Sequence, residues 1–124
     1  MRIKLFTHTD LDGVGCAVLA YLAFGYENVD VEFCSYDNVN QKVLKFIMSR
    51  SLSNSAYYGL YITDLSVSEE VARQIEKHKD NIMPRLFDHH ATALWLNKYD
   101  WCHVMENLPI CSYCKTSGTE LFYV

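Results

Sequence analysis

An α/β fold is predicted for this chain: a doubly wound, mainly parallel five-stranded sheet with helices on both faces. Apolar runs of strand length alternate with segments of helical spacing, a pattern typical of βαβ units. The 124 residues suit one domain, so we expect a single domain over residues 1–124. With 50% hydrophobic and 21% charged residues, the chain has enough apolar side chains to bury a core.

The expected strands are the apolar runs at residues 2–7, 29–35, 57–63, 83–87 and 101–105. The first reads RIKLFT, and the second, VDVEFCS, alternates at period two, as a half-buried strand does. Pro84 lies near the start of the fourth, where a strand tolerates proline.

Helices are expected between these strands. Residues 13–24 predict a buried helix that Gly25 closes, and residues 39–48 carry their apolar side chains on one face. Residues 68–79 predict a polar amphipathic helix with Ser66 or Ser68 as its cap. A short helical turn is expected at residues 93–96, and a helix begins at residues 117–123.

Charge and cysteine usage restrict the class of protein. The formal net charge of −4 argues against a broad basic surface for long nucleic acid, but a small anionic substrate held by a bound metal stays compatible with it. The sequence has no apolar run near the ~20 residues of a membrane helix and no signal-peptide layout. Five scattered cysteines indicate a reducing, cytoplasmic environment.

Acidic and histidine residues follow three of the predicted strands. HTDLDG follows the first strand, ITDLS closes the third with Asp64, and FDHH closes the fourth. Open α/β sheets bind ligands beyond the carboxyl ends of their strands, at the point where the strand order reverses. If the first and third strands are neighbours there, Asp64 faces the first cluster.

The first cluster predicts a metal site. In an extended HTDLD segment, His8, Asp10 and Asp12 point the same way. Their carboxylates repel one another without a cation, which would raise some of their pKa values. Carboxylate and imidazole ligands suit manganese or cobalt, and Asp64 could bridge two ions. Gly13 and Gly15 would let the backbone approach closely at a helix start.

Plainer interpretations exist for each motif taken alone. HxDxDG also fits a turn with a helix cap, and an aspartate at a strand end is often a turn former. The joint occurrence of the clusters at three strand ends favours metal binding. A zinc site built from Cys102, His103 and the CSYC segment is weaker, because adjacent residues of a strand point to opposite faces.

These motifs, in this order, resemble the DHH phosphoesterase family, and most closely its nanoRNase branch, which hydrolyses short oligoribonucleotides. HTDLDGVGC, ITDLS, DHHATALWLN and TSGTELFYV carry the resemblance. It implies a two-manganese site in which His8, Asp10 and Asp64 bind one ion and Asp12, Asp64 and His89 bind the other. It also implies that His90 contacts the scissile phosphate and that Asp88 orients the neighbouring histidine.

The resemblance implies a hydrolase: a manganese-dependent phosphodiesterase that cleaves short oligonucleotides, or a related small phosphate ester, with metal-activated water. Family members continue with a further aspartate ligand and a second, substrate-gripping domain, which this sequence lacks before Val124. We therefore expect a C-terminally truncated domain with an incomplete second ion site. The alternative is a catalytically weak metal- and nucleotide-binding module, or half of a split enzyme. For the truncated domain we also expect the apolar Leu121, Phe122 and Val124 to dock onto a second copy or a partner chain.

Overall fold

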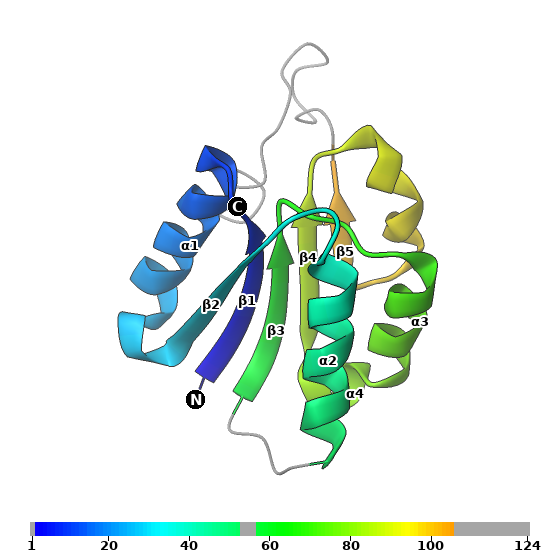
Figure 1. The fold of residues 1–124 in the computed structure, drawn as a ribbon, viewed down its shortest axis with the longest axis horizontal. Coiled ribbons are helices and arrows are strands. Elements are labelled where there is room, and N and C mark those ends of the chain that lie inside the picture. The colour runs from blue at the N-terminus through cyan, green and yellow to red at the C-terminus, as the bar shows by residue number, and fades with distance from the viewer. Residues whose placement is uncertain (1, 53–56, 106–124) are drawn as a thin grey trace.

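The computed structural model describes residues 2–52 and 57–105, without the side chains of residues 2, 12, 49–52, 57 and 58. Within this part, all strand pairs are parallel and helices cover both faces of a five-stranded sheet (Figure 1), which confirms the predicted fold class. The helix expected at residues 117–123, the CSYC segment and the proposed C-terminal docking residues lie outside the described residues.

The strands agree with the sequence prediction to within about two residues. They are β1 (Arg2–His8), β2 (Val29–Cys34), β3 (Tyr57–Thr63), β4 (Pro84–Asp88) and β5 (Cys102–Val104). Their order across the sheet is β2-β1-β3-β4-β5, so the chain moves outward from β1 in one direction and from β3 in the other. β1 and β3 are therefore neighbours at the reversal point, as the sequence argument required.

Each face of the sheet has its own helices (Figure 1). One face is covered by α1 (Leu11–Phe24); the short η1 (Tyr26–Asn28) follows that helix. The other face is covered by α2 (Val39–Leu52), α3 (Glu69–Lys77), α4 (Lys79–Ile82) and the 3-10 helix η2 (Ala91–Lys98). The single helix expected at 68–79 is thus two helices, of which Ser68 caps the first through the Val71 amide.

Alternation along β1 places side chains in two separate cores. Leu5 packs with Ala17 and Ala20 of α1, whereas Phe6 belongs to the larger cluster beneath α2 and α3. Both faces of the central strands are therefore buried, as is usual for a parallel sheet. The two cores hold the carboxyl ends of β1, β3 and β4 at a fixed edge.

The thiols of the described part bear on two sequence predictions. Cys16 and Cys34 are buried, as expected. Burial raises the pKa of Cys102 to about 12, and His103 lies exposed beside it, so the pair makes a poor zinc site.

None of the helices in the described ranges is long and apolar enough to cross a membrane.

Lys4 joins β1 to the edge strand β2 through a nearly buried ammonium group. Its Nζ lies 3.1 Å from both Asp30 Oδ2 and Glu32 Oε1. Burial lowers the pKa of Lys4, but the hydrogen bonds to Glu32 and Asp30 outweigh burial and raise the pKa above its ordinary 10.5. Charged Lys4 therefore stabilises the folded state, and this contribution disappears as the pH rises through the raised pKa.

Lys4→Met should lower the free energy of unfolding at pH 7 by about 1–2 kcal/mol, because the variant lacks both charge-assisted hydrogen bonds. The difference between wild type and variant should shrink as the pH rises from about 10.5 through the raised pKa, because the unfolded chain releases the Lys4 proton first and the folded state releases it later. Urea unfolding at pH 7, 9 and 11 measures this. Lys79→Met, which removes an exposed ion pair, is the control and should cost less at pH 7. A Lys4→Met penalty that stays constant across this pH range would contradict the assignment.

Candidate metal centre

The three predicted clusters lie at one edge of the sheet. His8 is the last residue of β1, Asp64 directly follows β3, and Asp88 is the last residue of β4. Because these strands are parallel and adjacent, their carboxyl ends meet at the reversal point between β1 and β3. The topology therefore brings together side chains from three separate parts of the sequence.

The first group of ligand-type side chains contains His8, Asp10 and Asp64. His8 Nδ1 lies 3.0 Å from Asp10 Oδ2 and 3.9 Å from Asp64 Oδ2. One nitrogen or oxygen atom from each residue falls within 4.8 Å of the others, a spacing that a single ion can span. Asp64 is fully buried in this group, whereas Asp10 is exposed.

The second group contains Asp64, Asp88, His89 and His90, again with ligand-type atoms within 4.8 Å of one another. His89 Nε2 lies 3.0 Å from Asp64 Oδ1, and His90 Nδ1 lies 2.6 Å from Asp88 Oδ1. Asp64 thus faces the first group with Oδ2 and the second with Oδ1. Among the described residues, it is the side chain that the two groups share.

The extended segment predicted over residues 8–12 is wrong. β1 ends at His8 and α1 begins at Leu11, because Asp10 caps the helix by accepting a hydrogen bond from the Gly13 amide at 2.8 Å. Asp10 still reaches His8 with its other carboxylate oxygen, so it serves as cap and cluster member together. Asp12 lies in the first turn of α1, and its side chain is outside the described ones.

Gly13 makes the tight connection between β1 and α1. A Cβ atom at this position would collide with the His8 backbone, so only glycine fits there. Beneath the site, Thr63 Oγ1 donates to Thr7 Oγ1 at 2.9 Å, and Thr7 Oγ1 donates to the Gly13 carbonyl at 3.0 Å. These buried hydrogen bonds join β3, β1 and the start of α1 directly below the clusters.

Asp64 adopts a left-handed backbone conformation with φ of 59°. Aspartate tolerates this region better than most residues, although it remains uncommon outside glycine. The Asp64 amide donates to the Phe87 carbonyl at 2.9 Å, which fixes the turn at the end of β3 against β4. The strained turn and the anchored amide hold the carboxylate between the two groups.

Asp88 contributes a buried acceptor to the second group. Its Oδ1 accepts the His89 amide at 2.9 Å and contacts His90 Nδ1, whereas Oδ2 is buried without a hydrogen-bond partner in the described part of the chain. A buried carboxylate oxygen without a partner is costly, and a cation or donor would offset that cost. The second group therefore has the chemistry of a cation site.

The pKa of Asp10 moves opposite to the expected direction. Burial raises the pKa, but hydrogen bonds with the Asp64 side chain, the Gly13 amide and the His8 ring outweigh burial and lower it to about 2. Capping and the nearby imidazole therefore supply the favourable contacts that the repulsion argument assigned to a metal. Asp10 is ionised near neutral pH and available as an anionic ligand.

Tyr36 is the site residue that the sequence argument missed. It lies in the loop between β2 and α2, where its ring stacks on His8 with centroids 4.6 Å apart and its hydroxyl lies 3.4 Å from His90 Nε2. Burial, followed by the charges of Asp64, Asp10 and Asp88, raises the pKa of Tyr36. The strand pattern could have indicated this residue, because β2 is also parallel to β1 and the loop after it therefore reaches the same edge of the sheet.

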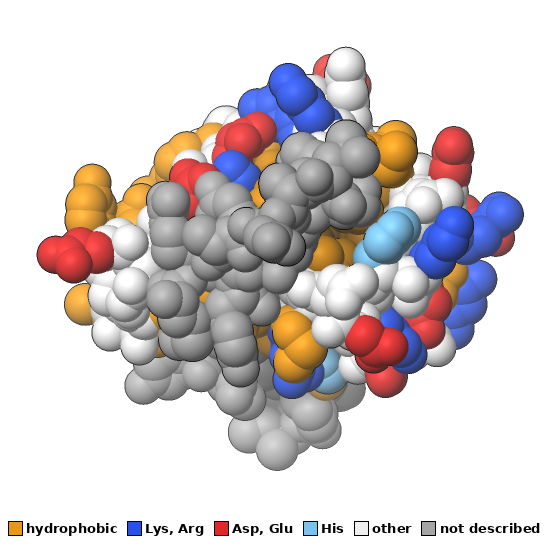
Figure 2. Space-filling model, turned by 90° about the horizontal axis from the view of Figure 1, so that it is seen from below, with side chains coloured by type: hydrophobic (Ala, Val, Ile, Leu, Met, Phe, Trp, Pro, Cys, Tyr) orange, Lys and Arg blue, Asp and Glu red, His pale blue; other side chains and the backbone are white. Residues whose placement is uncertain are grey.

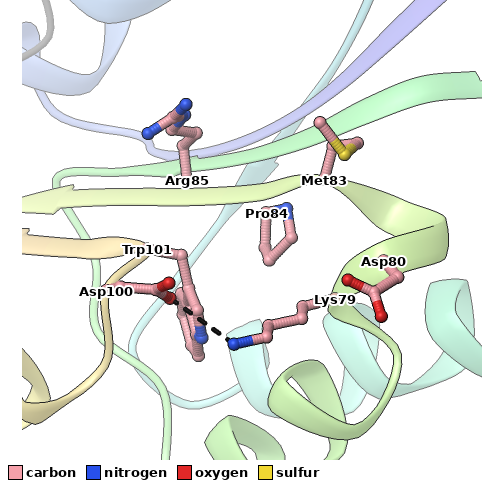
Figure 3. Close-up of a pocket in the computed structure, with 7 residues that line it drawn as sticks. All are labelled: Lys79, Asp80, Met83, Pro84, Arg85, Asp100 and Trp101. Atoms are coloured by element: carbon pink, nitrogen blue, oxygen red, sulfur yellow. Dashed lines mark ion pairs between the residues drawn. The ribbon is translucent and has the colours of Figure 1, made fainter.

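The opposite end of the sheet has a different character. A hollow of ≈ 220 Å³ lies beside the start of β4, lined among others by Lys79, Asp100 and Trp101 (Figure 3). The Lys79 ammonium lies 2.9 Å from Glu76 and 3.9 Å from Asp100, so its charge is compensated. Figure 2 shows this lower face, where acidic and basic side chains of the described residues are interspersed.

This chain resembles part of a longer protein in sequence. It is 37% identical over 120 residues to Oligoribonuclease NrnB of Bacillus subtilis (strain 168), an alignment that covers 96% of this chain and 29% of that protein. This chain is thus similar in sequence to an oligoribonuclease. Because the alignment covers 29% of that relative, the chain spans less than a third of the relative's length. No family model matches the sequence.

A solved structure supports the fold independently. The crystal structure of an uncharacterized protein from Helicobacter pylori G27 superposes with a TM-score of 0.77 and 21% sequence identity. The match covers 99% of this chain and 35% of the other. It shows that the arrangement of strands and helices occurs as one part of a longer protein.

Gly13→Ala should destabilise the fold by about 1–3 kcal/mol, because the new methyl group displaces the His8 backbone. Gly59→Ala is the matched control: its Cβ would meet the Met83 carbonyl at an ordinary 3.6 Å. Urea unfolding of both variants tests the difference. Equal stability of the two variants would show that the β1–α1 connection is not constrained as described.

Proposed function

We propose that this chain is the DHH-type phosphoesterase domain of a manganese-dependent phosphodiesterase that cleaves short oligonucleotides. The observation that carries the proposal is the buried Asp64 carboxylate, whose two oxygens face two separate groups of ligand-type side chains. A shared carboxylate between two ions is the usual arrangement in two-metal hydrolytic sites. The similarity to an oligoribonuclease supports short RNA as the substrate.

The residues present fit divalent ions. The two groups consist of aspartate and histidine side chains and include no cysteine, and their carboxylate oxygens and imidazole nitrogens suit manganese. The buried Asp88 Oδ2 supports a cation nearby. His8, Asp10 and Asp64 would hold one ion, and Asp12, Asp64 and His89 would hold the other. When bound, such ions lower the pKa of water and neutralise charge that develops on a phosphate.

The remaining residues would act on the substrate side. Asp88 Oδ1 accepts from His90 Nδ1 at 2.6 Å, which orients the ring and leaves Nε2 toward the open side of the site. His90 would then contact a non-bridging oxygen of the scissile phosphate. The His89 amide donates to the same Asp88 oxygen, so the two histidines are held in fixed relation. Asp88 is in this view a positioning residue.

Manganese should stabilise the wild-type protein, since a ligand that binds only the folded state adds about 2.7 kcal/mol at a hundredfold excess over its Kd. Asp64→Asn should abolish most of this gain while keeping the left-handed turn, which asparagine also tolerates. Thermal melts with and without Mn²⁺ measure the effect. Asp80→Asn, an exposed carboxylate far from the site, is the control and should respond as wild type does. A wild-type melting curve that Mn²⁺ leaves unchanged would refute the metal site.

Turnover distinguishes the proposed enzyme from a binding module. With protein in excess over a 5′-labelled dinucleotide and Mn²⁺ present, we expect slow release of mononucleotide. Asp64→Asn and His90→Ala should each lower the single-turnover rate by at least about a hundredfold, because they remove the bridging and phosphate-contacting groups. No cleavage above the protein-free rate, despite Mn²⁺ binding, would exclude the phosphodiesterase and support the binding module.

A further inference from the structure

Tyr36 stands apart from the packing of the protein. Its side chain is 55% exposed, and it belongs to neither hydrophobic cluster of the described residues. Its ring lies against the two site histidines, His8 and His90. A half-exposed aromatic ring outside both clusters contributes little to the core, so its contacts with these histidines favour a role in the site.

The loop that carries Tyr36 is an ordered turn. The Ser35 amide donates to Asn38 Oδ1 at 2.8 Å, and the Ser35 carbonyl accepts from the amides of Asn38 and Val39. Figure 1 shows this loop passing from the end of β2 across the carboxyl ends of the central strands to α2. The turn therefore presents Tyr36 above the site from a fixed base.

The ring of Tyr36 restrains His8. The two rings stack with centroids 4.6 Å apart and an angle of 28° between their planes. His8 Nδ1 is the atom that faces Asp10 and Asp64, so its direction depends on the rotation of the ring. Stacking on Tyr36 limits that rotation and keeps the nitrogen directed at the two carboxylates.

The hydroxyl of Tyr36 restrains His90. When His90 Nδ1–H donates to Asp88 Oδ1, Nε2 accepts a hydrogen bond in the neutral ring and donates one in the protonated ring. Tyr36 Oη lies 3.4 Å from Nε2 and can donate to the neutral ring or accept from the protonated one, which can share its Nε2–H with a phosphate oxygen. The ring of His90 is then held at both nitrogens, one by a buried carboxylate and one by a phenol from a different loop.

We infer that Tyr36 is a positioning residue for both halves of the site: its ring orients His8 for metal binding and its hydroxyl orients His90 for contact with phosphate. This inference rests on the proposed function for its catalytic half. The metal-binding half depends only on the geometry around His8. Partners that orient metal ligands typically change affinity or activity about 10- to 100-fold when removed.

Two substitutions separate the ring from the hydroxyl. Tyr36→Phe keeps the stacked ring, so Mn²⁺ affinity should stay within about twofold of wild type, while kcat for the dinucleotide falls about tenfold at nearly constant KM. Tyr36→Leu removes both contacts, so it should also weaken Mn²⁺ binding about tenfold. Mn²⁺ binding is followed by the loss of the free-ion EPR signal, and turnover by mononucleotide release.

A spectroscopic readout is independent of metal and activity. In NMR spectra of the metal-free protein, Tyr36→Leu should shift the ring protons of His8, because the stacked aromatic ring is gone, whereas Tyr36→Phe should leave them nearly unchanged. Tyr26→Phe and Tyr26→Leu are the matched controls. Tyr26 is an exposed tyrosine that contacts Tyr21 away from the site, and its variants should leave all three measurements at wild-type values.

The outcomes distinguish this inference from the proposed function. If wild type binds Mn²⁺ but does not cleave the dinucleotide, the phosphodiesterase is refuted, while the Mn²⁺ and NMR measurements still test the ring of Tyr36. If wild type cleaves and Tyr36→Phe matches its kcat, the role of the hydroxyl is refuted. A rise in KM alone would refute positioning and indicate direct contact with substrate. If Tyr36→Leu keeps both the Mn²⁺ affinity and the His8 chemical shifts of wild type, the role of the ring is refuted.

Discussion

The buried carboxylate of Asp64 is the group on which the site depends. It is fully excluded from solvent, and its two oxygens face different sets of side chains. A carboxylate in such a place is unfavourable unless neighbouring groups compensate its charge. The positive φ of its backbone and its amide bond to β4 hold it in this position against that cost. The histidines from β1 and from the end of β4 are arranged around this one fixed carboxyl group.

The parallel sheet explains why such distant residues can surround one carboxyl group. Parallel strands direct all their carboxyl ends to the same edge, and the order β2-β1-β3-β4-β5 makes β1 and β3 neighbours there. The two hydrophobic cores fix that edge from both faces. Side chains at the strand ends therefore need little flexibility of their own to meet, which suits a site that must keep several like charges close together.

Most of the fold could be predicted from the sequence because its signals are local. Alternating apolar runs and helical spacing gave every strand of the described part, and the motifs at strand ends located the clusters containing His8, Asp64 and Asp88. The start of α1 was missed because it depends on the close contact of Gly13 with the His8 backbone, which no periodicity records. Tyr36 was missed because a single tyrosine in a loop has no pattern. Its importance appears only when the β2–α2 turn is seen above β1. The side-chain placement of Asp12 stays a prediction.

The two threonines beneath the site constrain which sequences this fold can accept. Thr63 donates to Thr7, and Thr7 donates onward to the Gly13 carbonyl, so each hydroxyl is useful only while the next acceptor is present. Valine has nearly the same shape, but one valine here would leave a buried hydroxyl or carbonyl with fewer partners, whereas a matched pair of valines would remove both hydroxyls together. Positions 7 and 63 are therefore expected to change jointly in related sequences. Such covariation would mark the pairing of β1 with β3 even where the metal ligands themselves never vary.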